Sequence, residues 1–339
     1  MRQELITLNK ERNVTLTAYI QNVGGEFPRA SKRPGVIVIP GGGYTFCSER
    51  EADPVAIEYL KCGYHAFILR YSVGEHAMWP NPLNDFEQAM DYIRSNADAF
   101  GLYADKIVAA GFSAGGHLAA CAASLAKNKP NAAILGYAVT LEEMASWCSA
   151  GAPDASSAVG RTTCPCFVFA TRTDAVVPVE NSLRFINALN KYGIAFESHI
   201  YGFGPHGIST GNASVLDPSS ACGRAPYWVK DSIGWLGDMF GDFEENRMTA
   251  PRCKPRMRGD YDETLSVYCT MAHIMQNAEA RALLDSVMKG QAPPPPVGAD
   301  AGEAAGPAGL SLIEAMKFAH VPDEVIMMLD EQLSKIKNI

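Results

Sequence analysis

The fold is decided by one stretch of the sequence, Lys106-Ile-Val-Ala-Ala-Gly-Phe-Ser-Ala-Gly-Gly-His117, in which an apolar run passes directly into a glycine-rich turn. The apolar residues Ile107–Ala110 predict a buried strand, and the residues after the turn, Gly116–Ala126, have apolar positions at helical spacing. Small residues between the two permit a tight turn in which strand and helix approach closely. The stretch therefore predicts a strand, a sharp turn and a helix in immediate succession.

The same alternation of apolar runs and helical patterns extends from this stretch in both directions, as far as about Gly241. The expected strands are Glu4–Leu8, Thr15–Gln21, Gly35–Pro40, His65–Tyr71, Lys106–Ala110, Ala132–Tyr137, Pro165–Thr171 and Phe196–Tyr201. The expected helices are Pro82–Ala99, Gly116–Ala126, Val179–Lys191 and Trp228–Phe240. Such helices supply the crossovers that parallel strands require. The sequence predicts an α/β fold with an eight-stranded, mostly parallel sheet covered by helices on both faces.

The domain organisation follows from a change of composition near residue 242. We expect one large domain at 1–242, a basic connector at 243–260 and a helical extension at 261–339. A linker rich in Pro, Gly and Ala interrupts the extension at 290–309 and is too poor in large apolar residues to form a core. The extension carries two amphipathic segments, Leu265–Met288 and Leu312–Leu333. We expect these segments to pack against the large domain or against a second copy of the chain.

Composition excludes several classes of function. The formal net charge of −8 argues against nucleic acid as a partner, because affinity for phosphate backbones depends on clustered Lys and Arg. No apolar run approaches the roughly 18 residues that span a bilayer, so we expect no membrane partner. The nine cysteines are scattered, and the close pair Cys164-Pro-Cys166 lacks the C-x-x-C spacing of a metal or redox site. We therefore expect reduced thiols, a cytoplasmic location, no metal and no cofactor.

Gly111-Phe-Ser-Ala-Gly115 matches the G-x-S-x-G pattern of a nucleophile elbow. In this turn the serine hydroxyl projects from the end of a strand, at the start of the following helix, and is free to attack a carbonyl. The alternative interpretation is an ordinary glycine-rich turn between strand and helix. The position directly between a predicted strand and a predicted helix favours Ser113 as the nucleophile.

A glycine run, Pro40-Gly-Gly-Gly-Tyr44, directly follows another predicted strand. Acyl transfer needs backbone amides that point at the oxyanion formed in the transition state, and glycines permit that approach. We expect the amides of Gly42 and Gly43, with that of Ala114 after the nucleophile, to form the oxyanion hole. A simple turn or a phosphate-binding loop is the alternative, but the latter would require a following Lys-Ser/Thr or an acidic residue on the next strand.

The general base must follow the serine in sequence, because the chain order in such folds is Ser, then Asp or Glu, then His. His206 lies in Gly202-Phe-Gly-Pro-His-Gly207, a loop just beyond the last predicted strand. His117 falls on the helix after the nucleophile, and His199 falls inside a predicted strand. The loop position favours His206 as the base.

The third member should be an acid that follows the penultimate strand. Asp174 lies a few residues beyond the end of the predicted strand Pro165–Thr171. Its carboxylate would accept the Nδ1 proton of the base and stabilise the imidazolium. The alternatives are a helix-capping role for Asp174, or Asp154 or Glu180 as the acid.

With these elements in place, the first 240 residues resemble the bacterial acetyl esterase and acetylxylan or feruloyl esterase-like branch of the α/β hydrolases. The resemblance rests on the glycine run, the G-x-S-x-G turn and three further segments, Arg70-Tyr-Ser-Val73, Asp174-Ala-Val-Val-Pro178 with Glu180-Asn-Ser182, and His206-Gly207. Hormone-sensitive-lipase-like relatives carry a His where this sequence has Pro40, so the resemblance is to the acetylxylan-type branch.

The resemblance implies a serine carboxylesterase that removes short acyl groups, typically acetate, from a small-molecule or oligosaccharide ester. We expect an aromatic pocket wall formed by Tyr44, Phe46, Trp79 and Phe112, as sugar or aryl binding would favour, with ordinary core packing as the alternative. A feruloyl esterase, a peptidase-like hydrolase and a non-catalytic binding module are the competing readings of the same sequence.

Overall fold

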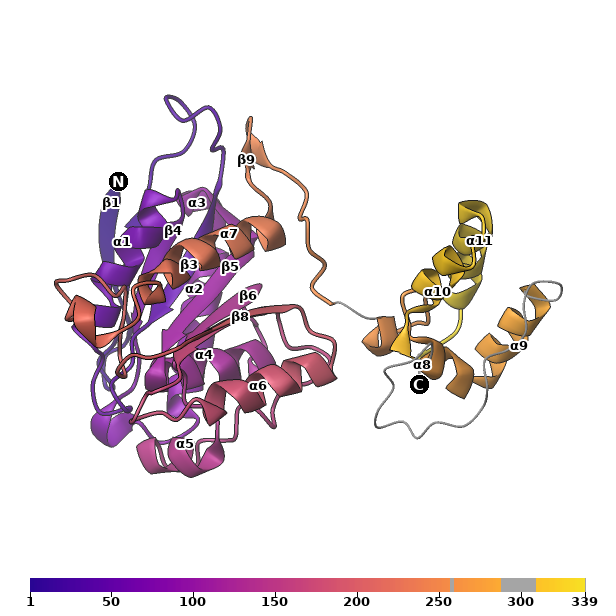
Figure 1. Cartoon of the computed structure of the whole chain (residues 1–339). Helices are drawn as coiled ribbons and strands as arrows, with labels where there is room; N and C mark the ends of the chain where they lie inside the picture. The colour runs from indigo at the N-terminus through magenta and orange to yellow at the C-terminus, as the bar shows by residue number, and fades with distance from the viewer. Residues whose placement is uncertain (257–258, 288–308, 339) are drawn as a thin grey trace. The chain divides into compact units, whose positions relative to one another are not determined.

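The computed structural model describes residues 1–256, 259–287 and 309–338. The chain divides into two compact units, Met1–Pro255 and Arg256–Ile339 (Figure 1). The first unit extends past the expected boundary at 242 because the following segment hydrogen-bonds back to it. The Ser31 hydroxyl donates to the Asn246 carbonyl at 2.6 Å, and the Ala195 amide donates to the Pro255 carbonyl at 2.9 Å. The linker expected at 290–309 lies, except for its last residue, outside the described residues.

The first unit is built on an eight-stranded sheet with the order β1-β2-β4-β3-β5-β6-β7-β8. The strands are β1 (Arg2–Asn9), β2 (Val14–Ile20), β3 (Arg33–Ile39), β4 (His65–Arg70), β5 (Leu102–Phe112), β6 (Ala132–Gly136), β7 (Cys166–Thr171) and β8 (Phe196–Tyr201). Strand β2 pairs antiparallel with β1 and with β4, and every other neighbouring pair in this sheet is parallel. The predicted eight-stranded, mostly parallel sheet is confirmed.

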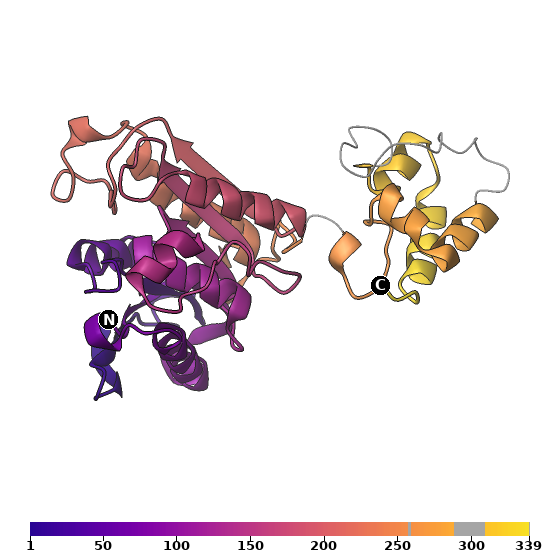
Figure 2. The same ribbon diagram turned by 90° about the horizontal axis from the view of Figure 1, so that it is seen from below.

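Helices cover both faces of this sheet, as Figures 1 and 2 show. Alternate residues of each central strand point to opposite faces. In β3, Val36 and Val38 pack with α1 (Asp53–Lys61) and α7 (Trp228–Phe240). Ile37 and Ile39 belong to the core on the other face, which α2 (Asn81–Ser95), α4 (Ser113–Leu125) and α6 (Glu180–Lys191) complete. The strands read as continuous apolar runs because both faces are covered.

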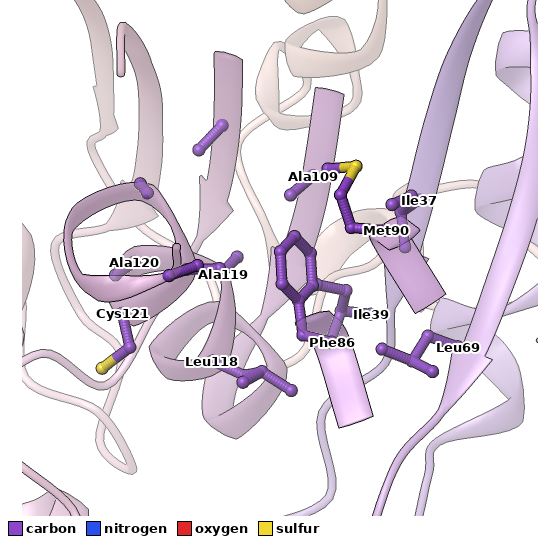
Figure 3. Close-up of a cluster of buried hydrophobic side chains, with 14 of the residues drawn as sticks. Ile37, Ile39, Leu69, Phe86, Met90, Ala109, Leu118, Ala119, Ala120 and Cys121 are labelled. Carbon is purple, nitrogen blue, oxygen red and sulfur yellow. The ribbon is translucent and has the colours of Figure 1, made fainter. Parts of the chain in front are cut away.

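The core under α2 and α4 fixes the strands that carry the site. Phe86 and Met90 of α2 and Leu118 of α4 are fully buried among strand residues of β3, β4 and β5 (Figure 3). Full burial of each such side chain contributes about 1.5–3 kcal/mol. This packing holds the carboxyl ends of β3 and β5 in register, and both the glycine run and the G-x-S-x-G turn begin there.

The described residues of the second unit form four short α-helices, α8 (Met271–Gln276), α9 (Ala278–Val287), α10 (Leu312–Phe318) and α11 (Asp323–Leu333). Each expected amphipathic segment is thus divided in two. Asn277 ends α8 and its side chain accepts from the amides of Glu279 and Ala280, so a new helix begins there. Pro322 immediately precedes α11. The described apolar residues form a separate small core that includes Leu265, Ile274, Leu284, Leu312 and Leu329.

The remaining described helices of the first unit are α3 (Ala97–Phe100) and α5 (Glu142–Cys148). Near its end, the first unit also holds a two-stranded hairpin, β9 (Phe243–Glu244) with β10 (Arg247–Met248). Of these, α5 bears on function, because it follows β6 at the same edge of the sheet as the residues described next.

Candidate active site

Ser113 lies at the junction of β5 and α4 and has a positive φ of 53°. A non-glycine residue in this region is strained, which is typical of a nucleophile elbow. The neighbouring glycines make the turn sterically possible. A Cβ atom at Gly111 would lie 2.2 Å from the Gly115 carbonyl oxygen, and one at Gly115 would lie 2.2 Å from that of Ile39. The turn therefore presents the Ser113 hydroxyl at the carboxyl edge of the sheet.

His206 lies in the loop after β8, and its Nε2 atom is 2.9 Å from the Ser113 Oγ atom. The loop is anchored to the end of β7. The Thr171 hydroxyl donates to the Gly204 carbonyl at 2.8 Å, and the Gly204 amide donates to the Thr173 hydroxyl at 2.9 Å. These bonds fix the backbone two residues before the imidazole, so the ring has a defined position over Ser113.

Asp174 follows β7 and its side chain is fully buried. One carboxylate oxygen, Oδ2, lies 2.7 Å from the His206 Nδ1 atom. The other, Oδ1, accepts from the amides of Val176 at 2.8 Å and Val177 at 2.9 Å. With the proton on Nδ1, the Nε2 atom is free to accept the Ser113 proton. The structure thus brings together the three residues that the sequence selected.

The alternative residues considered from the sequence have other contacts. His117 is buried beneath the elbow, where its ring lies 2.8 Å from the Tyr44 hydroxyl and 2.9 Å from the Pro153 carbonyl. Burial lowers the pKa of His117 to about 4, so the ring is neutral near pH 7. Glu180 forms an exposed ion pair with Arg184.

The other two alternatives, His199 and Asp154, are also hydrogen-bonded to other partners. His199 is 2.8 Å from Glu197 on the edge strand β8. Asp154 accepts from the backbone amides of Glu142 and Ser157 in a loop after α5.

The expected oxyanion donors surround the same hydroxyl. Gly42 and Gly43 line the cavity in front of Ser113 and have φ values of +126° and +61°. Side chains are excluded at position 42, since a Cβ there would lie 2.1 Å from the Phe46 carbonyl oxygen. Neither amide donates to an acceptor among the described residues. The Ala114 amide is in the first turn of α4, whose amides have no acceptor within the helix.

Glu51 lies behind the oxyanion loop and hydrogen-bonds to it. Its buried carboxylate accepts from the Gly41 amide at 2.8 Å and from the Tyr137 hydroxyl at 2.7 Å. The Tyr137 hydroxyl in turn accepts from the Ser209 amide at 3.1 Å, three residues after His206. Burial and the Glu51 charge raise the pKa of Tyr137 well above its usual range, so its hydroxyl stays protonated. Glu51 therefore links the oxyanion loop to the histidine loop.

The cavity in front of Ser113 has a volume of about 270 Å³. Apart from the residues of the site, its lining is largely apolar and includes Phe46, Val139, Met144, Trp147 and Val177. Two of these are unusually exposed for aromatic side chains, Phe46 at 58% and Trp147 at 84%. Exposed aromatic groups at the mouth of a cavity are typical of ligand contacts.

Of the four aromatic residues predicted for the pocket wall, only Phe46 lines this cavity, and the prediction is wrong for the others. Tyr44 is buried and hydrogen-bonded to His117. Phe112 is buried on the α7 side of the sheet, with its ring 5.6 Å from that of Trp228. Trp79 packs on the His117 ring at 5.5 Å. Each of the three is part of the core that supports the site.

Trp147 is one of several pocket residues that the sequence analysis missed. It lies on α5, one turn after Met144, and both side chains line the cavity. The signal available in the sequence was the three-residue spacing of Met144 and Trp147, which places both side chains on one face of a helix.

No group of three or more His, Cys, Asp or Glu side chains in the described ranges is arranged to hold a metal ion. Within the same ranges, no helix has both the length and the hydropathy needed to cross a membrane.

Comparison with known proteins gives a consistent set of relatives. Residues 27–142 match the family model described as BD-FAE. Among solved structures, the α/β hydrolase enzyme MGS-M1 from a Medee basin deep-sea metagenome library is 42% identical, with a TM-score of 0.65. The match covers 70% of this chain and 98% of that protein.

Two curated relatives have names that refer to xylan. Endo-1,4-beta-xylanase B of Butyrivibrio fibrisolvens is 32% identical over 211 residues, which is 53% of this chain and 33% of that protein. Acetylxylan esterase of Xylanibacter ruminicola is 27% identical over 198 residues, which is 52% of this chain and 41% of that protein. The chain thus spans about a third to two fifths of the length of these two relatives.

Proposed function

This chain belongs to the α/β hydrolases, and on that premise we propose that it is a serine carboxylesterase that removes short acyl groups from carbohydrate esters. The observation that carries the proposal is the continuous hydrogen-bonded series Ser113, His206 and Asp174, with distances of 2.9 and 2.7 Å, in front of an open cavity. This is the arrangement in which a serine hydroxyl becomes a nucleophile near neutral pH.

In the proposed mechanism, the Ser113 Oγ atom attacks the ester carbonyl carbon while His206 Nε2 takes the hydroxyl proton. Asp174 stabilises the resulting imidazolium through Nδ1. The amides of Gly42, Gly43 and Ala114 donate to the oxyanion of the tetrahedral intermediate. The intermediate collapses when His206 returns its proton to the alkoxide, and the alcohol leaves. Water then attacks the acyl-enzyme with His206 as base, which releases the acid and restores Ser113.

The size and lining of the cavity support a small acyl group. Its volume of about 270 Å³ lies just below the usual range for ligand pockets, and it must also hold part of the alcohol. The relative named acetylxylan esterase supports acetate on a carbohydrate. An aryl ester such as a feruloyl ester is the second candidate, because two exposed aromatic side chains, Phe46 and Trp147, border the cavity.

We also propose that the enzyme is cytoplasmic and acts on oligosaccharides or small esters. In support, all nine cysteines fall within the described residues and are free thiols, as is usual in reducing compartments.

The test is hydrolysis of 4-nitrophenyl acetate and of acetylated and feruloylated xylo-oligosaccharides by the full chain and by Ser113→Ala. We expect hydrolysis by the wild type and a loss of the order of a millionfold in kcat in the variant, as in a comparable triad. Equal activity of the two proteins would refute Ser113 as the nucleophile. A wild type that binds these esters without hydrolysing them would favour a non-catalytic binding module. Preference for the feruloyl ester would favour the second candidate.

A further inference from the structure

The oxyanion loop has a cavity on each side. Gly42, Gly43 and Ser48 line the catalytic cavity, whereas Thr45 and Cys47 line a second one of about 550 Å³. Phe46 lines both. The exposed Phe46 ring is therefore shared by the cavity in front of Ser113 and the second cavity, which we name the outer groove.

The outer groove is defined by Arg12, Asn13, Thr45, Glu49, Arg70 and His76, together with Phe46. Its lining is much more polar than that of the catalytic cavity. Ionisable groups come from four separate segments, the β1–β2 turn, the loop after β3, the end of β4 and the loop after β4. A ligand that enters this groove meets donors and acceptors on several sides.

The charges of the outer groove are compensated within the protein. Arg70 pairs with Glu49 at 2.9 Å, and His76 lies 3.7 Å from Glu75. Arg12 pairs with the buried carboxylate of Asp85. A guanidinium has five N–H donors and a carboxylate has about four lone-pair sites, so paired groups keep further capacity for hydrogen bonds. This combination suits a neutral ligand rich in hydroxyl groups better than a strongly charged one.

The way an ester must lie at Ser113 also favours a hydroxyl-rich ligand in the outer groove. With the carbonyl carbon at Ser113 and its oxygen at Gly42 and Gly43, the apolar wall of Val139, Met144 and Val177 is available to the acyl group. The catalytic cavity alone is too small for an acyl group and an oligosaccharide together. An alcohol half that passes Phe46 reaches the outer groove.

We propose that the outer groove binds the neutral sugar residues on the alcohol side of the ester, with Phe46 stacked on the ring nearest the scissile bond. This inference rests on the proposed function, because it assigns the groove to the alcohol half of the same substrate. The groove would then be the origin of any preference for oligosaccharides over simple acetyl esters.

The experiment compares kcat/KM for acetylated xylose, acetylated xylotriose and 4-nitrophenyl acetate, in the full chain and in three variants. Phe46→Ala and Arg70→Gln alter the groove. Arg184→Gln is the matched control, because it removes a comparable exposed ion pair, that with Glu180, on a helix that contributes no residue to either cavity. Circular dichroism and thermal unfolding establish that each variant is folded.

We expect the wild type to prefer acetylated xylotriose to acetylated xylose by at least fivefold. Both groove variants should lower the ratio of kcat/KM for xylotriose acetate to that for 4-nitrophenyl acetate by about tenfold, whereas Arg184→Gln should leave the ratio unchanged. A wild type that hydrolyses all three esters but shows no preference for the trisaccharide, or folded groove variants with an unchanged ratio, would overturn the inference and leave the esterase proposal intact. A wild type inactive on every ester would refute the proposed function and the inference with it.

Discussion

Glu51→Ala tests the connection between the oxyanion loop and the histidine loop. The substitution leaves the Gly41 amide and the Tyr137 hydroxyl without their charged acceptor in a buried region. Hydrogen bonds to charged groups contribute about 1.5–3 kcal/mol each, so we expect the loss of two to lower the free energy of unfolding by about 3–6 kcal/mol. Glu51→Gln can still accept from Gly41 through its amide oxygen, and should cost about 1–2 kcal/mol.

The catalytic consequence follows from the position of Gly41 directly before the proposed oxyanion donors. Loss of a complete donor costs about 100-fold to 1000-fold in kcat, so a loosened loop should cost about 10-fold to 100-fold in Glu51→Ala. KM for a small ester should change by less than about threefold, since the donors act mainly in the transition state.

The assay combines urea unfolding with kcat and KM for 4-nitrophenyl acetate. Asp85→Asn is a suitable control, because Asp85 is also a fully buried carboxylate and accepts from the Ser72 amide at 2.8 Å. The control should lose stability while the folded enzyme keeps its kcat. A folded Glu51→Ala enzyme with the kcat of the wild type would refute the positioning role, and equal losses of kcat in both variants would show a general effect of destabilisation.

Four further results are expected. Asp174→Asn should lower kcat by about ten-thousandfold on 4-nitrophenyl acetate, because the amide favours the wrong imidazole tautomer; a loss below tenfold would assign the role to another acid. Burial lowers the pKa of His117 to about 4, against about 6.5 in the unfolded chain. The folded state therefore binds fewer protons between these values, and the free energy of unfolding should fall by about 3 kcal/mol as the pH drops from 6.5 to 4. The pKa of the buried His65 is likewise lowered to about 4 by burial, so urea unfolding of His117→Asn should show a shallower but not absent pH dependence. An unchanged slope would contradict this. Acetate should exceed octanoate in kcat/KM among 4-nitrophenyl esters, and rising efficiency from C2 to C8 would contradict the small acyl site. A protein ending at Pro255 should keep kcat on a small acetyl ester within about tenfold, or roughly 1.4 kcal/mol of barrier. If the C-terminal helices mediate association, the number of subunits measured by size-exclusion chromatography should fall. A folded but inactive truncation would show that these helices contribute to the site.

The elements that could be predicted from the sequence are those governed by local chemistry. Buried parallel strands appear as short apolar runs, and the glycines around Ser113 and at Gly42 are required by close backbone contacts. The loop positions of Asp174 and His206 follow from the strands that precede them. These features depend on a few neighbouring residues, so the sequence alone was enough to select the residues that the structure brings together.

The pocket wall could not be predicted in the same way, because it depends on contacts between distant segments. Phe112 adjoins the nucleophile, but one step along a strand reverses the face to which a side chain points. Its ring packs on Trp228, more than a hundred residues away. Trp147 lies in a short helix with no recognisable motif and contributes to the site only because α5 follows β6 at the active edge of the sheet. The role of Glu51 likewise depends on Tyr137, which is remote in sequence.

The close packing at the turn of Ser113 has a consequence for mutational tolerance. Added Cβ atoms at Gly111, Gly115 and Gly116 would all lie within 2.6 Å of neighbouring atoms. Random substitution there should yield mainly misfolded protein, whatever ester is used for selection. The loop at 45–49 has no such restriction at Thr45 or Phe46, whose side chains are exposed and border the outer groove. Libraries intended to change the alcohol that the enzyme accepts should therefore vary this loop and leave the turn untouched.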